Sequence, residues 1–464
     1  MKIPNSPVEL PTLSISNKAK ETKIKSVLSP LIVEDEAQSK IKSIFIDEIR
    51  LGLSAKPERP SSLAMTNPFI KELMNGKENG SFLALDLGGT NFRVILIQIT
   101  DGIFDKEEVE YYNIPKHLFT EEGTKLYDFI AISIEHFLTN RGANDRHYDL
   151  GFTFSFPMHL EAIDVAIHTS WTKSFSCPGV IGKNVRELLS SAIQRKTNLD
   201  ISVTCVTNDC IATLVYGSYF DKRCAIGLIM GTGNNACYIE NTSNIHKWKD
   251  TERSESAVVL EWGAFGDNGV LDFLRTKWDR IVDKKSVVKR TYTFEKCLAG
   301  KYLGCLVREA LVTLAQEGLF CKGSTELLET HEHLKTSQIS KIEAEAFRDE
   351  LFYTKDVLSS YLELEDVTDD DARIAQYVCG LVSYRAALLL SLVTSMLLNR
   401  MDRPHCTIAV DGSLFVHHPR FKPLMELLIE QNAPGKSFNF LTTKDGSGKG
   451  AGLVAAIENR IRNS

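Results

Sequence analysis

Apolar residues recur along the chain with two spacings, one typical of helices and one typical of strands. Ile41, Phe45, Ile49 and Leu53 follow one another every four residues, which predicts a helix with one buried side. Further helices are predicted at residues 126–137, 270–282, 294–318, 371–400 and about 452–462, and short apolar strands at 81–87, 92–99, 151–156, 201–206, 225–230, 236–240 and 407–410. This mixture predicts an α/β protein.

One unit of this pattern occurs twice. The strands at 81–87 and 92–99 are joined by Gly-Gly-Thr-Asn, and those at 225–230 and 236–240 flank Gly-Thr-Gly-Asn-Asn. Helical segments follow each unit, so the repetition predicts two related lobes. The pattern alone leaves a single large α/β domain open as an alternative.

The N-terminal segment shows neither spacing. Its first 30 or so residues mix Pro, Ser and Lys, and we expect a loose arm there. The segment has no long apolar stretch and does not resemble a signal peptide. The longest apolar run, at 386–398, is too short to span a bilayer and predicts a buried helix, so we expect no integral membrane contact.

Composition narrows the class of protein further. The chain has 464 residues and a net charge of −6, so no overall basic field favours a nucleic-acid partner. Its 10 cysteines include no Cys-x-x-Cys pair and no zinc-like cluster with histidine. We therefore expect a reduced, cytoplasmic protein.

The two glycine turns are candidate phosphate sites. Glycine lets backbone N–H groups approach phosphate oxygens, and Thr90 and Asn91 add side-chain donors in the first turn. Asp86 precedes this turn and is a candidate for holding Mg²⁺ through water. An ordinary hairpin also favours Asn and Gly, but a second turn of the same kind, at 231–235, strengthens the phosphate interpretation.

Two rival nucleotide motifs are not supported. Gly448-Lys449 is reminiscent of a P-loop, but Thr443 and Gly450 occupy positions where that motif needs Gly and Ser or Thr. No Gly-x-Gly-x-x-Gly follows a predicted strand with a suitable acid, so a dinucleotide fold is not indicated.

Polar residues in short turns have the donors and acceptors that a sugar site needs. They are Ser155, Thr172, Lys173, Asn208, Asp209, Asn235 and Glu261. Each one alone has a simpler explanation; Asn208-Asp209, for example, also suits a helix cap.

Taken together, these motifs resemble the hexokinase family. The shared segments are Asp86–Arg93, Ser155-Phe156-Pro157, Trp171-Thr172-Lys173, Asn208-Asp209, Gly231–Tyr238, Glu261–Asp267, Phe294-Glu295-Lys296 and Asp411-Gly412-Ser413. They occur in the family's order over residues 35–462, at the length of a single-unit hexokinase.

The resemblance implies the two-lobed actin-like ATPase (ribonuclease H-like) fold, with a central cleft. It also implies ATP-dependent phosphorylation of a hexose 6-hydroxyl. The expected organisation is an N-terminal arm at 1–34, a large lobe at 35–79 and 211–446, and a small lobe at 80–210 and 447–464. Hexose and MgATP are the expected partners.

The resemblance also assigns roles to individual residues. Asp209 is similar to the family's general base, and Lys173 to its lysine near the transferred phosphoryl group. The expected sugar-binding residues are Ser155, Phe156, Thr172, Lys173, Asn208, Asp209, Asn235, Glu261 and Glu295. The expected ATP-binding residues are Asp86, Leu87, Gly88, Gly89, Thr90, Asn91, Arg93, Thr232, Gly233, Gly300, Lys301, Thr336, Ser340, Asp411, Gly412, Ser413, Leu414 and Phe415.

Several positions depart from the family pattern: Met158, Ser174, Val259, Leu260 and the segment 287–293, which lacks Asn-Pro-Gly before Glu295. Two other functions stay open: a kinase for another acceptor, such as an acetamido sugar, and a sugar sensor or scaffold without turnover. The preferred hexose, allostery, oligomeric state and loose docking to an organelle are also left open.

Overall fold

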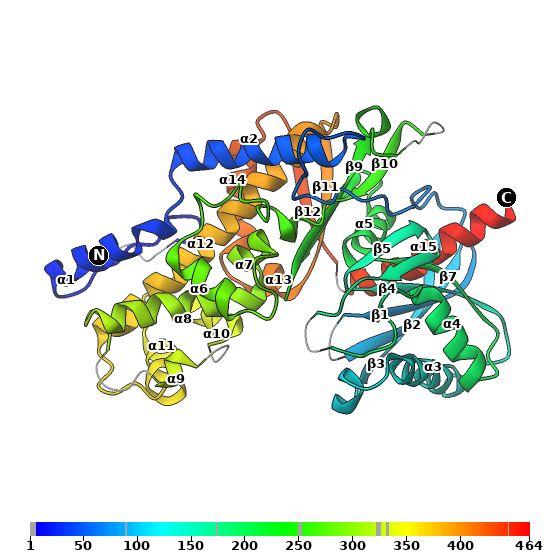
Figure 1. Cartoon of the computed structure of the whole chain (residues 1–464), viewed down its shortest axis with the longest axis horizontal. Coiled ribbons are helices and arrows are strands. Elements are labelled where there is room, and N and C mark those ends of the chain that lie inside the picture. Colours follow the sequence, from blue (N-terminus) through cyan, green and yellow to red (C-terminus); the bar gives the residue numbers. More distant parts are fainter. Residues whose placement is uncertain are drawn as a thin grey trace.

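A computed structural model describes residues 6–88, 91–172, 175–248, 253–321, 326–330, 334–443 and 445–464. Figure 1 shows two lobes, each built around its own sheet, which we name the small lobe (the sheet containing β1) and the large lobe (the sheet containing β8). The N-terminal helices lie on the large lobe and the C-terminal helix lies on the small lobe (Figure 1). The lobe boundaries given above stay predictions.

The sheet of the small lobe has the strand order β3-β2-β1-β4-β7. The first three strands are antiparallel, whereas β4 and β7 run parallel to β1. The strands are β1 Gly80–Leu87, β2 Asn91–Thr100, β3 Ile103–Asn113, β4 Tyr148–Phe154 and β7 Ile201–Thr207, with a separate hairpin of β5 Met158–Ala162 and β6 Val165–His168.

The sheet of the large lobe repeats this topology, with the order β10-β9-β8-β11-β12. Its strands are β8 Cys224–Met230, β9 Asn234–Asn241, β10 Glu255–Val259, β11 His405–Asp411 and β12 Ser437–Thr442. Here too the first three strands are antiparallel and the last two are parallel to the central one. Each glycine turn therefore lies at the carboxyl end of a central strand, where α/β sheets commonly bind ligands.

Two helices pack against each other between the sheets. α5 (Asp209–Phe220) covers β8 and β11, while α15 (Gly446–Asn463) covers β1, β4 and β7. The contact requires glycine, because a Cβ on Gly450 would lie 1.8 Å from the carbonyl oxygen of Ala212. α3 (Gly123–Thr139) and α4 (Val185–Lys196) pack on the other face of the small-lobe sheet.

The large lobe is mostly helical. α12 (Asp369–Arg400) passes through its core and contacts α2, α8, α10 and α14. The other helices are α1 Lys18–Leu28, α2 Asp35–Gly52, α6 Lys277–Lys285, α7 Thr293–Leu298, α8 Gly300–Gln316, α9 Glu326–Glu329, α10 Thr336–Ala346, α11 Phe352–Asp356, α13 Ser413–His417 and α14 Phe421–Asn432.

Among the described residues, α12 alone is long and apolar enough to cross a membrane, with a mean hydropathy of 1.8 over its most apolar window. Of that window, 89 % is buried inside the protein. The prediction of a buried helix is thus confirmed, but the expectation that this segment is too short to span a bilayer was wrong, because the helix extends beyond the apolar run.

The expectation of a loose N-terminal arm was wrong for the described part of that segment. α1 begins at Lys18 behind the cap residue Asn17, and Leu13 and Ile15 are buried in the core. The guanidinium of Arg420 donates to the backbone oxygens of Pro7 and Glu9 at 2.9 and 3.0 Å. These partners are far along the chain, so local periodicity did not reveal them.

Other elements also differ from expectation: β5, β6, β10 and β12 were not predicted, and the helix expected at 270–282 begins only at Lys277. The helix predicted at 294–318 is divided into α7 and α8, because the chain leaves helical geometry at Ala299 and the N–H of Gly300 bonds to Gly231 instead. β3 was not predicted, because it is mostly exposed and rich in charge, without an apolar run to mark it.

Candidate active site

The two strands that flank the first glycine turn are joined by an ion pair. Asp86 is buried at the end of β1, and Arg93, opposite it on β2, donates to its carboxylate. Ser447 Oγ donates to the same carboxylate at 3.1 Å. Burial alone would lower the pKa of Arg93, but attraction to Asp86 and Asp445 outweighs it, and the pKa is raised. Arg93 therefore stays cationic.

The N-terminus of α15 lies against the same strand ends, a neighbour that was not predicted from the sequence. The N–H of Ser447 donates to Asp411 at 2.9 Å, and Arg93 also pairs with Asp445. Three carboxylates thus surround a helix N-terminus, whose partial positive charge favours anions. Burial, with a smaller effect of Asp86, raises the pKa of Asp411. The sequence feature that could have indicated this part of the site is Gly446-Ser447-Gly448 at the start of a helix.

The second glycine turn is held by backbone bonds. The carbonyl oxygens of Gly231 and Thr232 accept from the N–H groups of Gly300 and Lys301 at 2.9 and 3.0 Å. Thr336 donates to the carbonyl of Gly300, and Ser340 Oγ donates to that of Thr336 at 3.0 Å. A Cβ on Gly300 would lie 2.5 Å from the Gly231 oxygen, so glycine is needed there. The predicted ATP-binding residues of this region, Thr232, Gly233, Gly300, Lys301, Thr336 and Ser340, are thus brought together.

The segment after β11 lies against this second turn. Gly412 has φ of 130°, and a Cβ there would lie 2.3 Å from the oxygen of Met230. Ser413 begins α13. The side chains of Leu414 and Phe415 are buried, and Phe415 packs on Phe440 with ring centroids 4.9 Å apart. Because both side chains are buried, Leu414 and Phe415 could contact a nucleotide only through their backbone atoms.

Four predicted sugar residues gather where the lobes meet. Asp209 is the first residue of α5, and Asn208 caps that helix through the N–H of Ile211 at 3.0 Å. The amide of Asn208 also reaches Glu261 Oε1 at 3.5 Å, and Asn235 Nδ2 donates to the same oxygen at 2.9 Å. Asn208 is thus both a helix cap and a member of the cluster.

Glu261 is held in an uncommon backbone conformation, with φ of 53° and ψ of 45°. Non-glycine residues in this left-handed region cost about 1–3 kcal/mol and are concentrated at functional sites. Burial, with repulsion by Glu295, raises the pKa of Glu261, while hydrogen bonds from Asn235 and Asn208 oppose that rise. This carboxylate is well suited to accept bonds from sugar hydroxyls.

Glu295 lies beside the same cluster. Its Oε2 accepts from the N–H of Asn234 at 3.1 Å, and the Asn234 side chain accepts from Trp262 Nε1 at 2.5 Å. Although Asn-Pro-Gly is missing before it, the preceding segment is anchored elsewhere. Asp267 accepts from the N–H groups of Tyr292 and Thr293 at 2.9 and 2.8 Å.

The Ser155 turn lies beside the first glycine turn. The N–H of Ser155 donates to Leu87 at 3.2 Å, and the buried Phe156 joins a cluster of aromatic rings below it. Thr172 is partly exposed, and its carbonyl accepts from Phe175 at 3.3 Å. Gly89, Thr90, Lys173 and Ser174 lie outside the described residues, as does the side chain of Asn91.

Three departures from the family pattern lie in the core or against it. Val259 ends β10, and both it and Leu260 are buried, with the N–H of Leu260 donating to Ala236 at 3.0 Å. Met158 begins β5 opposite His168 and packs against the small-lobe core. Each of the three contributes to packing.

The donor set near Asp86 fits Mg²⁺ held mostly by water and phosphate. Within the described part of the chain, no group of three His, Cys, Asp or Glu side chains is placed to hold a metal ion. Mg²⁺ in phosphate-transfer sites needs only one or two carboxylates and keeps several waters. Asp86, with Ser447 and Asp411 beside it, can supply that.

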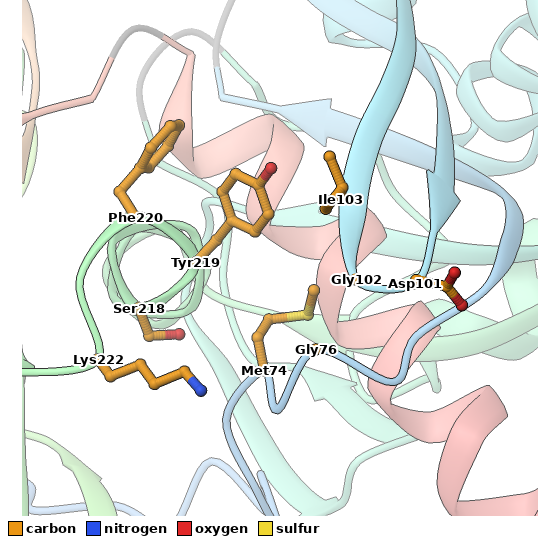
Figure 2. Close-up of a pocket in the computed structure, with 9 residues that line it drawn as sticks. All are labelled: Met74, Gly76, Asp101, Gly102, Ile103, Ser218, Tyr219, Phe220 and Lys222. Carbon is orange, nitrogen blue, oxygen red and sulfur yellow. The ribbon is translucent and has the colours of Figure 1, made fainter.

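A pocket of about 420 Å³ lies elsewhere, between the β2–β3 turn and the end of α5. Figure 2 shows Tyr219 and Ile103 on one side of it and Met74 and Lys222 on the other. None of the predicted site residues lines it.

The repeated sheets, with turns facing the helices between them, define the actin-like ATPase fold. A solved hexokinase from Schistosoma mansoni, in complex with glucose, matches with a TM-score of 0.88 and 35% identity over 95% of this chain and 100% of that one. Another hexokinase crystal structure matches with a TM-score of 0.79 at 25% identity.

The sequence comparisons agree with this assignment. Two hexokinase family models match residues 23–219 and 225–457. Human hexokinase-2 is 38% identical over 449 residues, and human hexokinase-1 is 37% identical over 433. The chain belongs to the hexokinase family. It spans about half the length of these curated relatives: 95% of this chain aligns with 48% of hexokinase-2.

Proposed function

We propose that this chain transfers the γ-phosphoryl group of MgATP to the 6-hydroxyl of a hexose such as glucose, giving hexose 6-phosphate for glycolysis. One observation carries this function: Asp209 begins α5 next to Asn208, which shares the carboxylate of Glu261 with Asn235. A base is thus adjacent to a cluster of hydroxyl-binding groups, near two phosphate-type turns. The glucose-bound relative adds support.

In this reaction Asp209 would accept the proton of the 6-hydroxyl as the oxygen attacks phosphorus. Such general-base help typically contributes about 10²–10⁴-fold in rate. Glu261, Asn235 and Asn208 would orient the sugar through its hydroxyls, because such bonds discriminate against molecules that lack them. Lys173 would lie near the transferred phosphoryl group, as in the family pattern.

The turns would hold the nucleotide. Backbone N–H groups of both turns and the N-terminus of α15 would face phosphate oxygens, with Arg93 as a cation nearby. Bound Mg²⁺ would offset phosphate charge near Asp86. Water competes with the sugar as acceptor, so we expect the lobes to close when hexose binds. Small-angle scattering with and without glucose tests this, and no compaction at saturating glucose would contradict it.

The decisive experiment is an assay of glucose and MgATP coupled to glucose-6-phosphate dehydrogenase, on the wild type and Asp209→Ala. We expect turnover in the wild type and a loss of about 10²-fold or more in the variant, with glucose binding kept in calorimetry. Asp369→Ala is the matched control, because Asp369 also begins a helix but is exposed and pairs with Lys355, far from the site in sequence. Equal activity in Asp209→Ala would contradict the assigned role.

The same assay separates the alternatives. Turnover with an acetamido sugar but not with glucose, mannose, fructose or glucosamine would indicate another sugar kinase. Hexose binding without any turnover would indicate a sensor or scaffold. We further propose a cytoplasmic location, in line with the ten free cysteines, and fractionation of the native source would test it.

A further inference from the structure

His168 occupies an unusual position under the sugar-binding segments. It ends β6 and is fully buried, with its ring edge-on to Trp171 at 4.2 Å and to Phe154 at 5.1 Å between centroids. Phe154 precedes the Ser155 turn, and Trp171 precedes Thr172. The imidazole therefore lies between the two segments from which the sugar-facing residues of the small lobe extend.

Its hydrogen bonding fixes one tautomer. His168 Nε2 lies 3.0 Å from the carbonyl oxygen of Ser170, so this nitrogen carries the hydrogen and donates. Nδ1 is buried without a hydrogen-bond partner among the described residues. Burial lowers the pKa of His168, in agreement with a neutral ring. A buried polar atom without a partner is costly, and an apolar side chain would avoid that cost.

The segments above His168 form one unit. The N–H of Thr169 donates to Pro157 at 3.1 Å, which ties the strand leaving His168 to the Ser155 turn. Trp171 Nε1 donates to Cys177 at 2.7 Å on the far side of Thr172. Without the bond from His168, the carbonyl of Ser170 would lose its partner in the middle of this unit.

We infer that His168 is a positioning residue, which holds the Ser155 turn and the Thr172 segment in fixed relation so that both meet the hexose. This inference rests on the proposed function. It concerns mainly the sugar, because the interactions above link His168 to the Ser155 turn and the Thr172 segment and to no described residue of either glycine turn. Weakening it should therefore change the KM for hexose more than the KM for MgATP.

A pair of amide variants tests this inference. In His168→Gln the amide nitrogen can reach the place of Nε2 and keep the bond to Ser170, whereas in His168→Asn the same amide is one methylene too short. We expect the KM for hexose to rise about tenfold in the Asn variant relative to the Gln variant, the value of one lost hydrogen bond. His136→Asn is the control, because His136 is an exposed histidine of the same lobe.

Each other outcome overturns the inference. Equal hexose KM values in the wild type and in both variants would mean that the bond does not position the sugar. Equal losses in both variants, with matching decreases in Tm, would mean a purely structural role. If the wild type phosphorylates no hexose, the proposed function fails separately, and the hexose Kd of the two variants by calorimetry still decides the role of His168.

Discussion

The β1–β2 turn and the β8–β9 turn occupy equivalent places in two sheets of the same topology, but different forces hold them. The strand ends that flank the first turn lie among charged groups: Asp86 and Asp445 share Arg93, and Asp411 accepts from the N-terminus of α15. The second is fixed by neutral bonds from Gly300 and Lys301, with Thr336 behind them. A repeated fold therefore does not imply a repeated mechanism of support.

The difference suggests a division of labour at the proposed nucleotide site. A turn surrounded by carboxylates and a cation is suited to metal and phosphate charge, because electrostatic contacts are strong in partly buried surroundings. The second turn is fixed by the close approach of two backbone segments, and its glycines leave no room for a side chain between them. Such a turn is suited to recognising the shape of the nucleotide. Four experiments test this contrast and the stability of the lobes around it.

Removing the charge at the first turn should have the largest effect. In Asp86→Ala we expect kcat to fall by about 10²–10³, the range seen when one preorganised electrostatic group is lost. The glucose Kd should change little, because Asp86 does not belong to the Glu261 cluster. Asp105→Ala, on the exposed strand β3, is the control. Unchanged turnover in Asp86→Ala would mean that charge near the first turn does not support catalysis, which would contradict the proposed contrast between the two turns.

Acid should weaken the large lobe through His418. This imidazole is fully buried beside Glu343, Arg420 and Ser383, and burial lowers the pKa of His418 from 6.5 to about 4. The unfolded chain therefore takes up a proton first, so this contribution to stability is full above pH 6.5 and is lost as the pH falls toward 4. At 1.36 kcal/mol per unit, the loss reaches about 3 kcal/mol.

Urea unfolding at pH 7, 6, 5 and 4 measures this loss, and His418→Gln should remove this share of the dependence of the unfolding free energy on pH. His136→Gln, at an exposed histidine, should keep it. If the unfolding free energy of His418→Gln depends on pH as in the wild type, the acid sensitivity comes from other groups, such as the carboxylates near the first turn.

Filling the close contact at the second turn should have a smaller effect. In Gly300→Ala the new methyl would lie 2.5 Å from the Gly231 oxygen, so the turn or α8 must shift. We expect a loss of about 1–3 kcal/mol, typical of overpacking, and a higher KM for MgATP with little change for hexose. Steady-state kinetics with each substrate varied in turn would give the two KM values. A change in the KM for hexose alone would contradict a role of this turn in fitting the nucleotide.

Loss of the Thr336 hydroxyl should have the smallest effect. Thr336→Val keeps the shape but removes the bond to the Gly300 carbonyl, which should cost about 1 kcal/mol in unfolding free energy. Thr336→Ser, which can keep the bond, is the matched control. Equal stability of the two variants would show that Gly300 needs no support from α10.

Local patterns predicted the two turns because each lies between strands with clear apolar runs. They also indicated Asn208-Asp209, but could not decide between a helix cap and a site; the structure gives Asn208 both contacts. Ser447 was missed because its partners, Asp86 and Asp411, are distant in the chain and only the fold brings them together. Partners of this kind leave no periodic signal.

The place of α15 has a consequence for biosynthesis. The small-lobe sheet is complete once Thr207 has been made, but the helix that covers β1 and β4 begins only at Gly446. During translation, the apolar face of this sheet therefore stays uncovered until the large lobe has been synthesised. Exposed apolar surface promotes aggregation, so the nascent chain is most prone to aggregate over that interval.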